Sequence, residues 1–270
     1  MLEPLFGRRS GQSMLVPVPP TVPVGQPPFR NCQKGHRIVK SVLLIGATQG
    51  TGRELAAEYA RRGAHVVITG RTAERAAEVA GELSKDVPGT VTGLALDLTR
   101  PAEIAAVLAP IERVDRLALV GMIRDRNTIA AYDVAAATEL AVTKVVGYTA
   151  VVSALAPRMA PDASVLLFGG VAKDYPYPGS TTVSAVNGAI TGLVRTMSVE
   201  LSPVRVNAIH PGAIEDSPYW AGNSDVLDPA RKLSLTGQLS SMSDIVDACV
   251  FLLENPVVNG VDLRVDGGRR

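Results

Sequence analysis

The stretch that decides the fold is VLLIGATQGTGRELAAEYARRG, residues 42–63. It begins with a short continuous apolar run over 42–46, which is typical of a strand covered on both faces. Leu55, Tyr59 and small alanines then recur at helical spacing until a closing glycine. The pattern predicts a strand, a glycine-rich turn and a helix in direct succession, which is the start of a βαβ unit.

The turn itself, GATQGTG, places glycines at 46, 50 and 52. Glycines let a backbone turn sharply and approach a pyrophosphate, whose charge then lies against the N-terminus of the following helix. Three glycines alone could simply form a tight loop, but their position between a strand and a helix favours nucleotide binding. We expect the turn to hold the cofactor through Gly46, Thr48, Gln49, Gly50, Thr51 and Gly52.

Working outward, strand and helix patterns alternate to the end of the chain. The further strands are expected at 64–70, 90–97, 116–120, 164–169, 204–209 and 261–268, and the further helices at 72–83, 131–156, 183–201 and 244–255. This alternation predicts an α/β protein with a Rossmann-like, doubly wound parallel sheet flanked by helices on both faces. We predict one such domain over 39–270, preceded by a disordered, proline-rich extension over 1–38.

The composition excludes several functions. Lys and Arg number 27 against 26 Asp and Glu, so no basic excess indicates nucleic acid or an anionic membrane as a partner. No apolar run is seen to approach the ~20 residues that span a bilayer, so no membrane segment and a cytoplasmic location are expected. The His and Cys residues show no metal-ligand spacing, so no metal is expected.

The end of the second strand indicates the cofactor. Proteins that select NAD usually place Asp or Glu there to hold the ribose hydroxyls, whereas this chain has Gly70 and Arg71. A guanidinium can pair with a 2′-phosphate, and such a charged hydrogen bond contributes about 1.5–3 kcal/mol. NADP(H) is therefore favoured over NAD(H), the alternative being that Arg71 only solvates the start of the next helix.

With these motifs, the chain resembles the short-chain dehydrogenase/reductase family over 41–268. GATQGTG resembles the family's glycine motif, Asp97 and Leu98 resemble the pair that contacts adenine, and VNAIHPGAI (206–214) resembles the segment along the nicotinamide. The resemblance implies further cofactor contacts after the fourth strand and after the sixth. These are expected at Val120, Gly121, Pro211, Gly212 and Ile214.

The resemblance fails at the family's catalytic positions. Members generally use a Tyr as proton donor, a Lys that lowers its pKa and holds the nicotinamide ribose, a Ser that orients the substrate and an Asn in the proton relay. Here Val183 falls at the Tyr, Asn187 at the Lys, Gly170 at the Ser and Lys144 at the Asn. Asn187 is still expected beside the cofactor. Because losing a general acid typically removes about 10²–10⁴ in rate, reduction by the family's usual route is not expected.

Three residues could replace the missing groups. Tyr175 and Tyr177 follow the fifth strand, near the expected pocket, although ordinary loop packing also explains them. Lys144 lacks an acidic partner one helical turn earlier. The positive charge that the family's lysine would supply at position 187 can therefore be supplied by Lys144 instead. The alternative is a lysine that extends along the helix surface into solvent.

Three functions are consistent with this pattern. The first is an NADP(H)-dependent oxidoreductase acting on a small carbonyl or hydroxyl compound with a non-standard proton donor. The second is a redox-neutral lyase, dehydratase or cyclase on the same scaffold, and the third is a catalytically inactive nucleotide-sensing protein. The helices over 131–156 and 183–201 carry small apolar residues on several faces, so a homodimer or homotetramer is expected.

Overall fold

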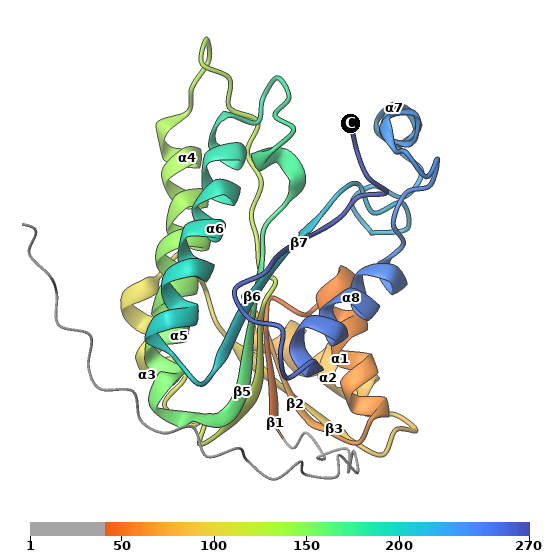
Figure 1. Cartoon of the computed structure of the whole chain (residues 1–270). Coiled ribbons are helices and arrows are strands. Elements are labelled where there is room, and N and C mark those ends of the chain that lie inside the picture. Colours follow the sequence, from red (N-terminus) through yellow and green to blue (C-terminus); the bar gives the residue numbers. More distant parts are fainter. Residues whose placement is uncertain (1–40) are drawn as a thin grey trace, which may run out of the picture. The chain divides into compact units, whose positions relative to one another are not determined.

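A computed structural model describes residues 41–270, so the predicted extension over 1–38 lies outside the described residues. The strands form one parallel sheet in the order β3-β2-β1-β4-β5-β6-β7 (Figure 1). Their bounds are β1 Ser41–Ile45, β2 His65–Gly70, β3 Thr90–Ala95, β4 Val114–Leu119, β5 Met159–Phe168, β6 Arg205–Pro211 and β7 Asp262–Val265. The prediction of a doubly wound parallel sheet is confirmed.

Helices cover both faces of this sheet (Figure 1). Their bounds are α1 Gly50–Arg61, α2 Ala73–Leu83, α3 Ile104–Val107, α4 Val134–Ala141, α5 Tyr148–Leu155, α6 Thr181–Glu200, α7 Ser224–Leu233 and α8 Met242–Glu254. On one face, apolar side chains of α1, α2 and α8 pack in a single core cluster. On the other face, α3, α5 and α6 pack in a second cluster, so the sheet is buried from both sides.

Two helices were not anticipated. The four-residue α3 is too short to show a period, and α7 contains Pro229, a residue that disfavours the interior of a helix. The helix expected from residue 131 begins later, at Val134, because the Asp133 side chain accepts a hydrogen bond from the Ala136 N–H and caps it there.

The long helix of α4 and α5 is interrupted by a π-helical turn over Val142–Gly147. The whole helix, Val134–Arg158, contains an 18-residue window with a mean hydropathy of 1.5 and is long and apolar enough to cross a membrane by length and composition. The expectation that no segment approaches that length is therefore wrong. A core helix passes the same test, and α5 buries Tyr148 and Leu155 against the sheet, so this is weak evidence for a membrane span.

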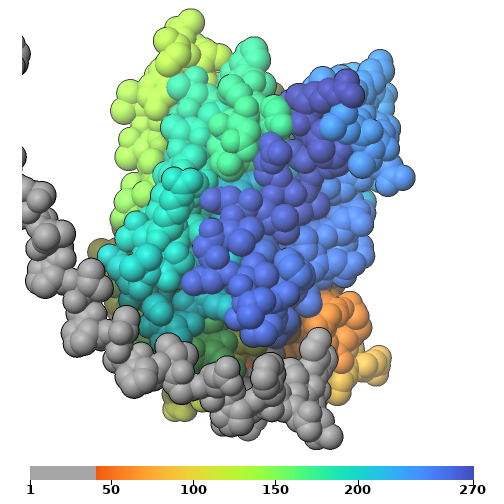
Figure 2. Space-filling view, in the orientation of Figure 1, coloured from red at the N-terminus to blue at the C-terminus, as the bar shows by residue number. Residues whose placement is uncertain are grey.

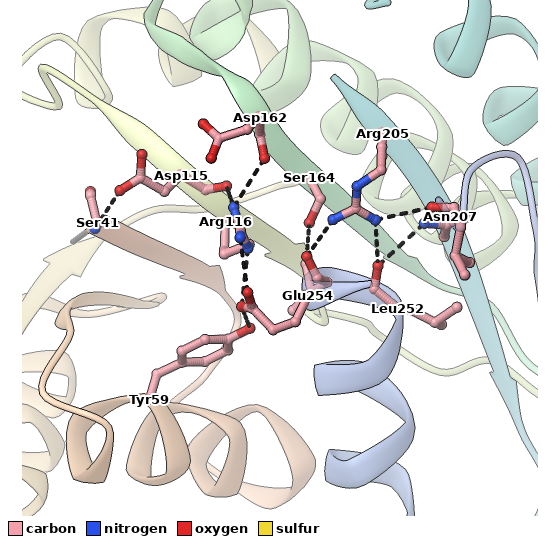
Figure 3. A network of polar contacts seen from close by, with 12 residues as sticks. Ser41, Tyr59, Asp115, Arg116, Asp162, Ser164, Arg205, Asn207, Leu252 and Glu254 are labelled. Carbon is pink, nitrogen blue, oxygen red and sulfur yellow. Dashed lines mark hydrogen bonds and ion pairs between the residues drawn. The ribbon is translucent and has the colours of Figure 1, made fainter. Parts of the chain in front are cut away.

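At the edge where the strands begin, two buried arginines tie α8 to the sheet (Figure 3). Arg116 of β4 and Arg205 of β6 lie in register on either side of Ser164 of β5. Arg116 donates to both carboxylate oxygens of Glu254, at 3.0 and 2.8 Å. Arg205 donates to carbonyl groups at the end of α8, including Leu252 at 2.9 Å. These charges stabilise the C-terminus of α8, whose carbonyls lack helical partners.

At the opposite edge, where the strands end, the strand order reverses between β1 and β4. Ligands of open α/β sheets bind at this edge, beside such a reversal. The end of the chain lies at the same edge, next to the segment around α7 (Figure 2). There Thr236 N–H donates to the Gly267 carbonyl at 3.1 Å, and Arg270 N–H donates to the Leu233 carbonyl at 3.2 Å.

Candidate functional site

The glycine turn joins β1 to α1 at the strand reversal. Gly46 and Gly50 have φ angles of +81° and +56°, in the left-handed region that favours glycine. A Cβ on Gly46 would lie 2.2 Å from the Gly121 Cα, so the backbones of the two loops touch directly. Gln49 precedes α1 without capping it through its side chain, which leaves the first N–H groups of the helix available to an anion. The turn therefore fits a pyrophosphate.

The neighbouring residues of the turn are held closely. A Cβ on Gly70 would lie 2.6 Å from the Thr48 Cγ2, and a Cβ on Gly52 would lie 2.9 Å from the Gly46 carbonyl oxygen. Thr51 is buried, whereas Gln49 is exposed. The absence of side chains at these glycines is what allows the turn to close against β2.

A cavity of about 350 Å³ lies beyond the turn, at the ends of β2 and β3. Arg71, Asp97, Arg100 and Glu103 supply its charged lining, and Arg71 is exposed. Burial raises the pKa of Asp97, but hydrogen bonds from Thr99 and the charges of Arg100 and Arg71 bring that pKa below its usual value. The cavity thus combines two carboxylates with two guanidinium groups at the ends of β2 and β3, where the adenosine half of a dinucleotide is expected.

Three other residues that were expected to contact the cofactor have mainly structural contacts. The Leu98 side chain is buried in the core, and its Cδ1 would lie 3.0 Å from a Cβ on Gly121. The N–H groups of Val120 and Gly121 both donate to the Ile45 carbonyl, at 2.9 and 2.8 Å. These contacts fix the end of β4 beside the glycine turn.

Three of the positions that the resemblance aligns with the family's catalytic residues come together at the end of β5. Lys144, from the π-helical turn, donates from Nζ to the Phe168 carbonyl at 2.7 Å and to Asn187 Oδ1 of α6 at 3.3 Å. A Cβ on Gly170 would lie 2.8 Å from Asn187 Nδ2. Val183 lies one turn earlier on α6 and is half-buried.

Lys144 is only 1% exposed, so the alternative of a lysine extending into solvent is wrong. Burial, with a smaller effect from the charge of Arg124, lowers the pKa of Lys144 to about 7. The group therefore exchanges its proton near neutral pH.

Tyr175 and Tyr177 lie apart from Lys144. The Tyr175 hydroxyl accepts a hydrogen bond from Arg264 at 2.9 Å, and the guanidiniums of Arg264 and Arg269 lie 5.6 and 5.4 Å from its ring centroid. Tyr177 is 50% exposed. Within residues 41–270, neither hydroxyl hydrogen-bonds to Lys144 or Asn187.

The floor of the site is formed by His210 of β6, which is fully buried. Its Nδ1 accepts from the Gly170 N–H at 3.2 Å, so its Nε2 carries the proton and donates to Asp262 at 2.8 Å. Burial lowers the pKa of His210, although Asp262 opposes this effect. A neutral histidine thus positions the loop that carries Gly170.

The segment after β6 closes the nicotinamide side. A Cβ on Gly212 would lie 3.2 Å from the Asp266 Cβ, which packs the predicted Pro211–Gly212 corner against the segment after β7. Ile214 pairs with Ser240 in an isolated β-bridge.

Sequence reasoning missed one residue at this edge, Arg124, whose guanidinium lies over the Tyr219 ring. Its only sequence signal is a charged triplet, Arg124 to Arg126, in the loop after β4.

A glycine turn beneath an open helix N-terminus, at the reversal of a seven-stranded parallel sheet, defines the class as a Rossmann-type dinucleotide-binding protein. Comparison with known proteins agrees. A family model described as Enoyl-(Acyl carrier protein) reductase matches residues 46–270. The cis-2,3-dihydrobiphenyl-2,3-diol dehydrogenase of Paraburkholderia xenovorans is 30% identical, over 85% of this chain and 90% of its own.

Two further relatives extend the comparison. The 3-oxoacyl-(acyl-carrier-protein) reductase of Bos taurus is 27% identical, over 85% of this chain and 97% of its own. The solved structure of MalC Reductase/Diels-Alderase from Malbranchea aurantiaca has a TM-score of 0.77 at 24% identity and covers 85% and 94% of the two chains. This chain belongs to the short-chain dehydrogenase/reductase family, whose members are oxidoreductases that use nicotinamide cofactors.

Proposed function

We propose that this protein is an NADP(H)-dependent oxidoreductase that interconverts a carbonyl and a hydroxyl group on a small molecule. The observation that carries the proposal is the intact cofactor cradle, in which Gly46 and Gly50 adopt left-handed conformations before an uncapped helix. Bound NADP(H) would supply or accept the hydride. The chain's own residues have to bind the substrate, orient it and hold the proton.

The preference for NADP(H) is supported by Arg71. Arg100 lines the same cavity but lies near two acids, 3.9 Å from Asp97 and 3.5 Å from Glu103. Arg71, in contrast, has no ion pair with any residue in the described part of the chain. A guanidinium without a carboxylate partner at the end of β2 is placed to pair with a 2′-phosphate.

For the proton, we assign Lys144 in place of the family's tyrosine. Its ammonium group is held by the Phe168 carbonyl and Asn187 at the end of β5. A pKa of about 7 allows the group to hold a proton and release it near neutral pH. The charged form would also stabilise negative charge that develops on a nearby substrate oxygen.

A titration of cofactor fluorescence tests the first half of the proposal. NADPH should bind about 10- to 100-fold more tightly than NADH, and Arg71→Ala should narrow this gap. Arg75→Ala is the matched control, because Arg75 lies at the start of α2 and pairs with Glu78 at 2.6 Å, outside the cavity. Equal affinities of the unaltered protein for the two cofactors would contradict the preference.

NADPH oxidation with a small activated diketone tests the second half. The unaltered protein should reduce such a compound slowly, and Lys144→Met should remove this activity while cofactor binding persists. Unchanged turnover in the folded Lys144→Met variant would exclude Lys144 as the proton source.

Redox-neutral chemistry is the second candidate, and the specific observation that favours it is the absence of a hydroxyl group at Val183 and Gly170. The MalC neighbour is itself titled a reductase and Diels-Alderase, which is consistent with both kinds of chemistry on one fold. Mass spectrometry of co-purifying compounds would distinguish this candidate, through a product that forms without NADPH oxidation. Tight cofactor binding without any product would favour the non-catalytic, nucleotide-sensing alternative.

A further inference from the structure

A side-chain cluster at the strand-end edge is not used by the functions described above. It is formed by Arg124 from the loop after β4 and by Tyr219 and Trp220 from the segment after β6. The Arg124 guanidinium carbon lies 3.4 Å from the Tyr219 ring centroid and 5.3 Å from the Trp220 ring centroid. The two rings meet edge to face, with centroids 4.4 Å apart. The aromatic surfaces therefore hold the guanidinium in one orientation.

This guanidinium lacks an acidic partner. Within residues 41–270 no carboxylate forms an ion pair with Arg124. Partial burial lowers the pKa of Arg124, and only the hydroxyls of Tyr219 and Tyr177 oppose that effect. The residue is nevertheless reachable from solvent. The Tyr219 hydroxyl is the hydrogen-bond partner of this side chain, and no acid compensates its charge. An exposed arginine that stacks on aromatic rings and has no acidic partner is suited to an anionic ligand.

The cluster also lies in the right place for a substrate. The charge of Arg124 is close enough to Lys144 to lower the pKa of that residue further. On the other side, Pro218, which directly precedes Tyr219, has its Cδ 3.8 Å from a Cβ placed on Gly50 of the glycine turn. Arg124 thus lies between the proposed proton source and the segment that covers the cofactor turn.

We infer that the substrate of this protein carries a carboxylate, which Arg124 binds through the free edge of its guanidinium while Tyr219 and Trp220 hold the group flat. Planar, bidentate recognition is what distinguishes arginine from lysine at a carboxylate. The inference rests on the proposed function for the location of the reacting carbonyl, and it specifies the substrate class as keto acids or hydroxy acids. The charge of a bound carboxylate would also offset the two cations, Arg124 and Lys144, that share this edge.

The test uses binding, so that it does not depend on turnover. Trp220 is the only tryptophan in the chain, and its fluorescence reports on this cluster directly. The protein, saturated with NADP⁺, is titrated with 4-acetylbenzoate and with 4-acetylbenzamide, two ketones of nearly equal shape that differ in charge. The unaltered protein should bind the acid about 10- to 100-fold more tightly than the amide.

Three variants make the test specific. In Arg124→Gln the preference for the acid should fall to nearly one, and in Arg124→Lys it should be only partly retained, because the charge remains without the planar fork. Arg126→Gln is the matched control. Arg126 is exposed and lies two residues after Arg124, so this variant loses one positive charge but should keep the preference for the acid. Because the ratio of two affinities is compared within each variant, a general loosening of the cluster does not mimic the expected result.

Equal affinities for acid and amide in the unaltered protein would overturn the inference, as would a preference that survives in Arg124→Gln. Failure of both ketones to bind at millimolar concentration also counts against it. A preference for the acid without NADPH-dependent reduction would leave the inference standing and refute the proposed oxidoreductase. Equal binding of both ketones, with NADPH-dependent reduction of both, would refute the inference of a carboxylate substrate and leave the proposed oxidoreductase standing.

Discussion

The side-chain oxygen of Asn187 lies 3.3 Å from the ammonium nitrogen of Lys144. In the pattern of the family that this chain resembles, the first of these helices carries an asparagine and the second a lysine. If the family resemblance is followed residue by residue, the two residue types have changed places between facing helices, and in this structure they are in contact. A positive charge is therefore kept beside the end of β5, although it arrives from the other helix.

This exchange predicts strong coupling between the two positions. Asn187→Lys alone would place two ammonium groups in contact in a buried site, and we expect it to destabilise the fold by about 3–5 kcal/mol. The double variant Lys144→Asn, Asn187→Lys restores one amide and one ammonium and should recover most of that loss. Urea unfolding of both singles and the double measures the coupling. Additive changes would mean that the pair does not interact.

The buried ammonium group also predicts a pH dependence of stability. The pKa of Lys144 is about 7 when folded and 10.5 when unfolded, so between these values the unfolded chain binds more protons and stability rises with pH. Relative to Lys144→Met, the unaltered protein should gain about 3 kcal/mol in free energy of unfolding from pH 7 to pH 9.5. Chemical unfolding at both pH values checks this. A difference that does not change with pH would show that the folded pKa is not lowered.

Restoration of the family's catalytic set is a third prediction. The structure requires that it be made as a unit, because a Cβ on Gly170 would lie 2.8 Å from the Asn187 amide nitrogen. Combining Gly170→Ser, Val183→Tyr, Asn187→Lys and Lys144→Asn should give NADPH-dependent reduction of a small activated diketone above that of the unaltered protein. A folded, NADPH-binding variant that stays inactive would show that the pocket itself has diverged.

A matched pair of glycine substitutions tests the role of His210. A Cβ on Gly169 would lie 2.2 Å from the His210 ring, whereas a Cβ on Gly188 of α6 would meet nothing within 4 Å. Gly169→Ala should therefore cost about 1–3 kcal/mol or more through overpacking. Gly188→Ala should instead stabilise the fold by up to about 1 kcal/mol through helix propensity. Thermal unfolding of both variants compares them, and equal effects would contradict the packing around His210.

Much of the fold could be predicted because its signals are local. Continuous apolar runs identified the strands, and the glycine turn identified the first βαβ unit. The α7 helix was not predicted, because Pro229 lies inside it and its apolar period extends over only ten residues.

The candidate site was less accessible to sequence reasoning. The residues expected to bind the cofactor could be predicted from the glycine turn and from the ends of the strands, because these features recur at fixed places in this topology. The contact between Lys144 and Asn187 depends on how two helices face each other, and the stacking of Arg124 on Tyr219 joins segments far apart in the chain. No spacing along the sequence encodes either contact, so both required the three-dimensional structure.

The π-helical turn over Val142–Gly147 determines the direction in which the side chains in it and directly after it point. Lys144 points toward β5, and Tyr148 donates its hydroxyl to the Gly121 carbonyl at 2.9 Å. Each residue of an α-helix advances by about 100°, so deleting one residue between these two positions would shift their relative direction by roughly that angle. Only one of the two contacts could then survive. We therefore expect a one-residue deletion here to break a contact at one end of the site even if every remaining side chain is kept.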